Sequence, residues 1–312
     1  MIETCDLSKQ FNNDFWAVDG VTLSVQPGQI LALLGQNGAG KTTTVRMLTA
    51  LLAPTRGWAR VGGFDVTKNP QDVRAQVGVL TEQHGLYMRM TAIEYLEFFG
   101  RIYGLDPAAR KSRTGHLLGY FGLEDAARRR LGEYSKGMKQ KLALARALMH
   151  DPSVLLLDEP TSAMDPESSR LVRDEIARLR SSQRTIVICT HNLAEAEALA
   201  DRIAIIYRGR ILLNDTLDEL KRQVLGPVEY EANFAEVFDA GDLSLPSGVE
   251  LTFRSGTSLR FRVDAPAVAN PQLVHALTSR HAPLVSFQEV PRKLEQVYLK
   301  TMAEVQGAAY AA

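Results

Sequence analysis

The sequence predicts an α/β fold built on a parallel sheet, followed by a smaller domain of α+β character. The first sign is a glycine-rich stretch, residues 35–42, between a predicted strand and a predicted helix. The second is a pair of short apolar strands, residues 154–157 and 185–189, with a helix between them, the βαβ pattern of a parallel sheet. The third is a change of character near residues 221–227. We therefore expect two domains, at residues 1–220 and 221–312.

Size and composition narrow the class of protein. The 312 residues suffice for one large and one small domain, and 45% apolar with 23% charged residues is ordinary for a soluble globular chain. Lys plus Arg and Asp plus Glu both number 36, so no excess charge points to nucleic acid or to an anionic membrane. The two cysteines, Cys5 and Cys189, suit a reducing compartment. With no signal peptide and no apolar run near the ~18 residues of a membrane helix, we expect a soluble protein that reaches a membrane only through a partner.

Strand signals dominate the start of the first domain. Alternation over residues 21–25 predicts a half-buried strand, and Pro27-Gly28 predicts a turn into a fully apolar strand at residues 30–34. A helix at residues 43–52 is expected to follow the glycine-rich stretch. Further strand signals lie at residues 60–66 and 77–80.

Helical periodicity replaces the strand signals from residue 91 to about residue 146. Ile93, Leu96, Phe99 and Ile102 recur at near-helical spacing. After the βαβ unit, a helix rich in Ala and Glu leads into a strand at residues 203–207. Gly209 then turns the chain into a short strand at residues 211–213.

The second domain has its own hairpin. Apolar residues alternate with polar ones before and after a Ser255-Gly256 turn, at positions 249, 251 and 253 and again at 259, 261 and 263. The remaining pattern predicts a helix at residues 271–280, a strand at 284–290 and a helix at 291–305.

The glycine-rich stretch fits the phosphate-loop pattern G-x-x-x-x-G-K-[ST]. Its glycines let backbone N–H groups turn toward phosphate oxygens, and the following helix directs its positive dipole end to the same point. Lys41 supplies a cation for the phosphates and the Thr42 hydroxyl is a ligand for Mg²⁺. The alternative is a chance glycine-rich turn, against which the flanking strand and helix argue. The candidate phosphate-binding residues are Gln36, Asn37, Gly38, Ala39, Gly40, Lys41, Thr42 and Thr43.

An acidic pair ends the apolar strand at residues 154–157. Asp158 is placed to hold Mg²⁺ directly or through water, and Glu159 to orient or deprotonate the water that attacks the γ-phosphate. Alone, such a pair fits a solvated turn equally well. Beside a phosphate loop, the catalytic interpretation is favoured.

A second anion-binding helix start is predicted at residues 134–140. Ser135 is a suitable N-cap, and Gly137 permits a close approach of the backbone. A plain capped helix is the alternative.

Together these segments resemble an ABC-type ATPase. The resemblance rests on the order and spacing of the phosphate loop, residues 134–140, the Asp158-Glu159 pair, Asp165 and His191, and it spans residues 1 to about 215. It implies a P-loop ABC-type nucleotide-binding domain, with an inserted helical subdomain at about residues 88–150 that grips a membrane partner, and Mg-ATP as ligand. Residues 85–103 resemble the version of this subdomain in ABC-2-type sodium- and drug-export ATPases.

The resemblance also implies roles for single residues. Ser135 and Gly137 match the signature segment that binds the γ-phosphate of ATP held by the opposite subunit, and Asp165 matches the loop that couples the two sites. His191 matches the switch histidine at the γ-phosphate. Phe11 matches the aromatic that stacks on adenine; Trp16 is a weaker substitute, and simple packing is the alternative for both.

Two departures from the family pattern stand out. The signature, usually Leu-Ser-Gly-Gly-Gln, reads Tyr-Ser-Lys-Gly-Met here, as in variants of the ABC-2 type. The glutamine that usually bridges Mg²⁺, the attacking water and the membrane subunit falls at Glu82, with Gln83 beside it, and the sequence does not decide which of the two points inward. The expected metal ligands are thus Thr42, Asp158 and Glu82.

The resemblance implies an ATPase that works with a membrane protein. Glu159 would act as base in a head-to-tail dimer, either a homodimer or a pair with a paralogous ATPase. The chain would drive a separate membrane-spanning permease, as an exporter, from the cytoplasmic face of the membrane. The alternatives are a soluble ABC ATPase of an assembly pathway, a nucleic-acid-linked ABC ATPase and a regulatory nucleotide sensor. The nucleic-acid-linked class needs coiled-coil arms or two nucleotide domains, and a sensor needs no base. The transported substrate and the role of the second domain stay open.

Overall fold

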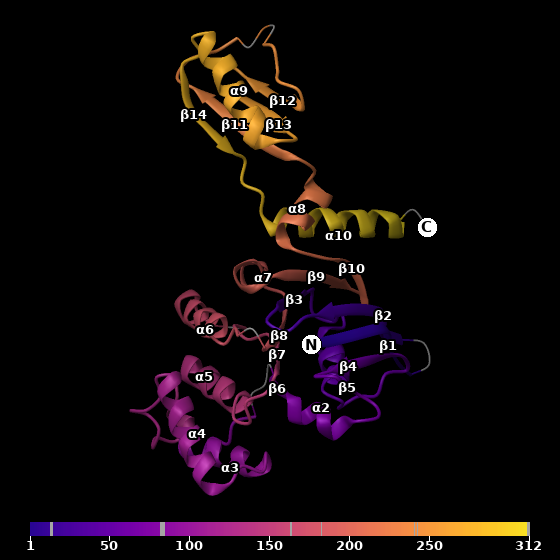
Figure 1. Cartoon of the computed structure of the whole chain (residues 1–312), viewed down its shortest axis with the longest axis vertical. Coiled ribbons are helices and arrows are strands. Elements are labelled where there is room, and N and C mark those ends of the chain that lie inside the picture. The colour runs from indigo at the N-terminus through magenta and orange to yellow at the C-terminus, as the bar shows by residue number, and fades with distance from the viewer. Residues whose placement is uncertain are drawn as a thin grey trace. The chain divides into compact units, whose positions relative to one another are not determined.

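The computed structural model describes residues 1–12, 15–81, 85–162, 164–181, 183–239, 241 and 243–310, with side chains to residue 307. The chain divides into two compact units, Met1–Leu217 and Asp218–Ala312 (Figure 1). Each unit has its own sheet and core, and each is described by itself.

A six-stranded sheet forms the centre of the first unit. Its strand order is β10-β9-β3-β8-β7-β6, and all neighbours are parallel except the β9–β10 hairpin. The strands are β3 (Ile30–Leu34), β6 (Val77–Leu80), β7 (Val154–Asp158), β8 (Thr185–Thr190), β9 (Arg202–Tyr207) and β10 (Arg210–Asp215). Every residue of β3, β7 and β8 is buried, because both faces of a parallel sheet are covered, and this explains their continuous apolar sequence.

A second, antiparallel sheet belongs to the same unit. Its order is β2-β1-β4-β5, and the strands are β1 (Ile2–Phe11), β2 (Phe15–Val25), β4 (Arg56–Val61) and β5 (Phe64–Asp65). The β1–β2 register places Phe11 opposite Phe15 at the open end of the hairpin. Irregular register in β1 lets the Ser8 hydroxyl, instead of a main-chain oxygen, accept the Gly20 N–H at 2.9 Å.

The helices of the first unit begin at well-defined caps. Besides α1 (Lys41–Leu48) and α2 (Pro70–Gln76), they are α3 (Ala92–Ile102), α4 (Pro107–Tyr120), the 3₁₀ turn η1 (Leu131–Glu133), α5 (Lys136–Ala147), α6 (Pro166–Arg178) and α7 (Leu193–Leu199). Thr91 and Glu94 form a capping box on α3, and the Asp106 carboxylate caps α4. The predicted helical stretch is therefore three helices. The helix after the phosphate loop begins at Lys41, two residues earlier than predicted.

Alternate residues of the central strands supply two separate cores. Leu155, Leu157, Ile186 and Ile188 pack with the residues of α3, α4 and α5, whereas Leu156 and Val187 pack with α1 and the antiparallel sheet. Figure 1 shows these helices and the antiparallel sheet on opposite sides of the central strands. The phosphate loop thus leaves β3 at the edge of a rigid two-sided core.

The second unit is an antiparallel sheet with one helix over it. The order is β12-β13-β11-β14, from β11 (Val228–Phe234), β12 (Val249–Ser255), β13 (Ser258–Val263) and β14 (Leu284–Glu289). Helix α9 (Pro266–Ser279) buries Ala269, Leu273 and Leu277 against Phe261 and its neighbours. The helices α8 (Leu217–Leu225) and α10 (Leu294–Tyr310) precede and follow this layer.

Two boundaries in this unit differ from the prediction. Pro271 was expected to begin a helix, but α9 begins at Pro266 and contains Pro271 in its interior. Both prolines fit the first turn of a helix by sequence. Pro266 takes that position because the helix must include Ala269, which precedes Pro271 and is buried in the core of this unit. The last helix was expected from residue 291, and α10 begins at Leu294.

Candidate nucleotide site

The loop from β3 to α1 has the shape that a phosphate requires. Gly40 is the N-cap residue of α1 with φ 108°, and it has no side chain that could accept a hydrogen bond from the first N–H groups of the helix. A Cβ on Gly40 would lie 2.5 Å from the Ala17 carbonyl oxygen, and a Cβ on Gly35 would lie 2.4 Å from that of Ile206. Glycine is therefore required at both positions, and the helix start keeps its N–H groups for a ligand.

A pocket of about 330 Å³ lies over this loop. It is lined by Phe15, Ala17, Gln36, Asn37, Gly38, Gly40, Lys41, Thr42, Thr43, Asp158 and Glu159. Seven of the eight candidate loop residues line it; the eighth, Ala39, is only 5% exposed and packs beneath. The two acidic residues predicted beside the loop line the same pocket, because β3 and β7 run parallel with β8 between them, so their carboxyl ends lie at one edge of the sheet.

The two candidate metal ligands in the described residues touch each other. The Thr42 hydroxyl donates to Asp158 Oδ2 at 2.9 Å, and Asp158 is 5% exposed at the end of β7. A hydroxyl and a carboxylate oxygen side by side are the hard oxygen donors that Mg²⁺ prefers, so these residues fit the ion. The third predicted ligand, Glu82, lies outside the described residues, as does Gln83.

Glu159 connects the phosphate loop with His191. Lys41 Nζ is 3.2 Å from Glu159 Oε1, and His191 Nδ1 is 2.8 Å from Glu159 Oε2. Lys41 Nζ also donates to the carbonyl oxygens of Gly35 and Gln36, at 2.6 and 3.2 Å. The three side chains therefore form one chain of polar contacts, with Lys41 and Glu159 buried and His191 half exposed.

The backbone of Glu159 is held in an unusual conformation. Its φ is 51°, in the left-handed region that non-glycine residues rarely adopt, at a cost on the order of 1 kcal/mol. Its N–H donates to the Cys189 carbonyl oxygen at 2.8 Å, which fixes the residue across β7 and β8. This strain turns the carboxylate toward both Lys41 and His191.

One aromatic residue of the β1–β2 hairpin lines this pocket. Phe11 is not among the lining residues, whereas Phe15, its partner in the β1–β2 register, is. Trp16 points to the other face of the strand, where the Arg56 guanidinium lies 4.3 Å from its ring centroid. The period of two along β2 was the available signal, since it puts Phe15 and Ala17 on one face.

The residues assigned to the opposite subunit do not line this pocket within the described part of the chain. Ser135 caps α5 by accepting the Met138 N–H at 3.2 Å, and Asp165 caps α6 by accepting the Ser168 N–H at 2.9 Å. The hydrogen bonds to Ser168 hold the pKa of Asp165 below its usual value. A Cβ on Gly137 would find Met164 at 3.8 Å, an ordinary contact.

Two polar residues near the site were not predicted. The Gln140 side-chain amide, buried on α5, donates to the carbonyl oxygen of Pro160 and so ties the signature helix to the residue after Glu159. Glu195 on α7 is buried; burial raises the pKa of its carboxyl group, against the lowering effect of the Thr190 and Thr161 hydroxyls. Each acts on a residue of another element, so the periodicity of its own helix did not mark it.

The comparisons with known proteins agree with this site. The sequence model of the ABC transporter family matches residues 18–162. The ABC transporter ATP-binding protein NatA of Bacillus subtilis is 43% identical over 224 residues, which is 70% of this chain and 91% of that protein. The daunorubicin/doxorubicin resistance ATP-binding protein DrrA of Streptomyces peucetius is 37% identical over 303 residues, 96% of this chain and 91% of that protein. A solved structure of an ATP-binding subunit of an ABC transporter has a TM-score of 0.65 and 32% identity, and the match covers 72% of this chain and 94% of that one.

The fold and the site are thus those of an ABC-type ATPase domain. The chain belongs to the ATP-binding proteins of the ABC transporter family, which confirms the resemblance and the predicted fold class. The assembly-pathway alternative is not favoured, because the relatives are transporter proteins. Within the described residues, no helix is long and apolar enough to cross a membrane.

Proposed function

We propose that this chain is the ATP-hydrolysing motor subunit of an ABC-2-type exporter and drives a separate membrane-spanning permease. One observation supports this most strongly: the Thr42–Asp158 contact and the Lys41–Glu159–His191 chain meet at one pocket over the phosphate loop. In this proposal the loop residues Gln36 to Thr43 hold the phosphates of ATP. Phe11 stacks on the adenine from the open end of the hairpin, and Phe15 joins it because it lines the pocket.

Mg²⁺ would be held by Thr42, Asp158 and Glu82. When bound, the ion neutralises phosphate charge and orients the γ-phosphate. Lys41 is the second source of positive charge. Since its ammonium group is 3.2 Å from Glu159, an arriving phosphate competes with that carboxylate for the same cation. Binding of ATP would thereby release Glu159 for its own task.

Glu159 would serve as the general base. Its carboxylate accepts a proton from water as the water oxygen bonds to the γ-phosphorus and the bond to the β–γ bridging oxygen breaks, giving ADP and phosphate. His191, 2.8 Å from the other carboxylate oxygen, would orient Glu159 and contact the γ-phosphate. The fixed backbone of Glu159 supports this role, because a base must be within hydrogen-bond reach of the water.

The active unit would be a head-to-tail dimer. Ser135, Gly137 and Asp165 lie outside the pocket of their own chain, so they are available for the nucleotide of a second subunit. Both halves of the composite site are intact in this sequence. A homodimer would hold two competent sites, and a pair with a paralogous ATPase is the other arrangement.

The partner and the location follow from the relatives. DrrA is named for drug resistance, and its match extends over both units of this chain. We therefore infer an export function, a permease contacted through the helical subdomain at about residues 88–150, and a peripheral position on the cytoplasmic face of the membrane. No nucleic-acid partner is proposed, since the formal net charge is zero.

Steady-state ATP hydrolysis measured against protein concentration tests the proposal. For wild type the rate should rise faster than linearly with protein concentration, because two chains form each site. Glu159→Gln should abolish hydrolysis yet accumulate as an ATP-bound dimer in size measurements. A rate linear in protein with a monomer throughout would remove the composite site. A Glu159→Gln variant as fast as wild type would remove the base.

A further inference from the structure

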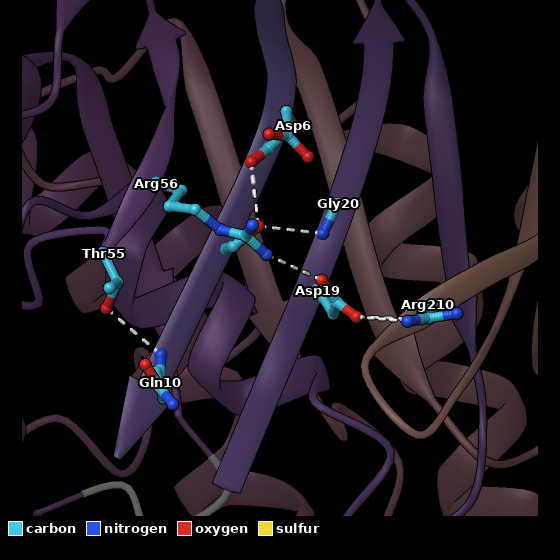
Figure 2. Close-up of polar contacts among 8 residues, drawn as sticks. Asp6, Gln10, Asp19, Gly20, Thr55, Arg56 and Arg210 are labelled. Atoms are coloured by element: carbon cyan, nitrogen blue, oxygen red, sulfur yellow. Dashed lines mark hydrogen bonds and ion pairs between the residues drawn. The ribbon is translucent and has the colours of Figure 1, made fainter. Parts of the chain in front are cut away.

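A carboxylate on the antiparallel sheet gathers two arginines from elements far apart in the chain. Arg210 Nε and Nη2, on β10, donate to Asp19 Oδ2 on β2 at 2.9 and 2.7 Å. Arg56 Nη2, at the start of β4, is 3.3 Å from Asp19 Oδ1 (Figure 2). Asp19 is 19% exposed and the two guanidinium groups reach it from the solvent side. The Asp19 side chain on β2 therefore bonds to residues of β4, in its own sheet, and of β10, in the other sheet.

The arginine on β10 follows a tight turn that lies against the phosphate loop. Arg208 and Gly209 join β9 to β10 with φ values of 46° and 80°. Positive φ at both central residues is the geometry of a short hairpin turn that glycine accommodates. A Cβ on Gly209 would lie 2.9 Å from the Ala17 carbonyl oxygen and 3.0 Å from Val18 Cα. The turn is thus packed backbone to backbone on β2.

Gly209 forms hydrogen bonds to β2 on one side and to the phosphate loop on the other. Its carbonyl oxygen accepts the Asp19 N–H at 2.9 Å, and its N–H donates to the Ala39 carbonyl oxygen, also at 2.9 Å. Gly40, the next residue of the loop, packs on the same carbonyl of Ala17. Because Lys41 and Thr42 follow directly, a displacement of this turn displaces the start of α1.

From this geometry we propose that Asp19 is a positioning residue for the phosphate loop. The Asp19–Arg210 pair fixes the Arg208–Gly209 turn, and the turn holds Ala39 and Gly40 in the conformation that binds phosphate. Arg56 holds the second carboxylate oxygen of Asp19 and packs its guanidinium over Trp16, on the face of β2 opposite to Phe15 and Ala17. The inference rests on the proposed role of the loop in binding ATP.

The Asp19–Arg210 ion pair lies partly in solvent, so its strength depends on its geometry. Exposed ion pairs in general contribute little to stability. Here two donors of one guanidinium converge on one oxygen, the carboxylate is mostly shielded, and a second arginine shares it. The expected effect is therefore on the placement of the loop more than on the stability of the fold.

The test is a double-mutant cycle of Asp19→Asn and Arg210→Ala, read as the Kd of Mg-ATP, KM, kcat and the Tm. Each single variant should weaken ATP binding about 3- to 10-fold, and the double variant no more than the worse single one, because both remove the same contact. Arg210→Lys should recover only part of the affinity, since one ammonium group cannot place two fixed donors on Oδ2.

A matched pair in the second unit provides the control. Arg222 and Glu219 are 2.7 Å apart, with side chains 73% and 29% exposed against 71% and 19% for Arg210 and Asp19. Glu219→Gln and Arg222→Ala should change Tm by a comparable amount and leave the Kd of ATP unchanged.

The outcomes separate this inference from the proposed function. If the Asp19 and Arg210 variants lower Tm but keep Kd and KM within two-fold of wild type, or if their effects on Kd simply add, the positioning role is wrong. If Lys41→Ala, measured beside them, binds ATP as well as wild type, the assignment of the loop itself fails.

Discussion

The start of α1 differs in structure from the starts of α5 and α6. Gly40 gives α1 no side-chain acceptor, so its N–H groups face the pocket with Lys41 and Thr42. Ser135 and Asp165 instead occupy the N–H groups of their own helices. A helix start whose N–H group is bonded by its own cap residue needs no ligand for its stability. The comparison teaches that the phosphate-loop half of the site can be recognised within one chain, whereas the signature half, in our proposal, acts only with a second chain.

The largest effect is expected when the phosphate-loop half of the site is disrupted. Lys41→Ala should weaken ATP binding about 10- to 100-fold, because a charge-assisted contact to the phosphates is lost. It should also abolish hydrolysis. Lys111→Ala on the exposed surface of α4 is the matched control and should behave as wild type. Titration with a fluorescent ATP analogue measures both, and unchanged affinity in Lys41→Ala would contradict the loop assignment.

The next largest effect tests the signature half of the site by mixing two impaired variants. Ser135→Ala should lower kcat about ten-fold or more while the monomer keeps its ATP affinity, because the serine acts on the nucleotide of the other chain. In a mixed dimer with Lys41→Ala, one composite site keeps both an intact loop and an intact serine. An equimolar mixture should therefore regain about a quarter of wild-type activity if subunits pair at random. Recovery of nothing would place Ser135 outside the composite site.

A smaller effect is expected at the aromatic end of the pocket. Phe15→Ala should raise the KM for ATP about 5-fold, since base–aromatic stacking contributes about 1 kcal/mol at the low end of its range. Phe11→Ala tests the residue expected from the family pattern. If the KM rises only in Phe11→Ala, then Phe11 alone contacts the adenine. If the KM rises in each of the two variants, then both aromatic residues at the hairpin end contact it. GTP measured in parallel reports whether stacking or base recognition is lost.

The sequence predicted the parts of this site that depend on strand ends and missed those that depend on packing between distant elements. Thr42 and Asp158 could be placed together because buried parallel strands end at one edge of the sheet. The Asp19–Arg210 pair joins residues 191 positions apart, and nothing local connects a strand on one sheet with a hairpin on another. Pro271 shows the same limit in the fold: two prolines fit a helix start, and tertiary burial selected the earlier one.

The smallest expected effect concerns Glu195, which no local pattern marked. Burial raises the pKa of this carboxyl group, with Glu159 adding to the rise and Arg173 opposing it. A raised pKa means that the folded protein binds this proton more tightly than the unfolded chain does, so charging Glu195 costs no stability below the usual pKa of a glutamate, and the cost grows as pH rises through the folded-state pKa. Glu195→Gln removes the charge and keeps the size of the side chain. We expect its Tm to exceed that of wild type at pH 7.5 by about 2–4 °C, the shift that 1 kcal/mol produces in a domain of this size.

The advantage of Glu195→Gln should disappear near pH 4, where both proteins carry a neutral side chain at this position. Thermal unfolding followed by circular dichroism across this range measures the difference, with Glu197→Gln on the exposed side of α7 as control. A Tm advantage that is constant with pH would assign the effect to packing. A wild type that is the more stable protein at pH 7.5 would mean that the Glu195 carboxylate is charged and held by its threonine partners. Glu195 would then resemble Asp165, because hydrogen bonds lower the pKa of the Asp165 carboxyl group.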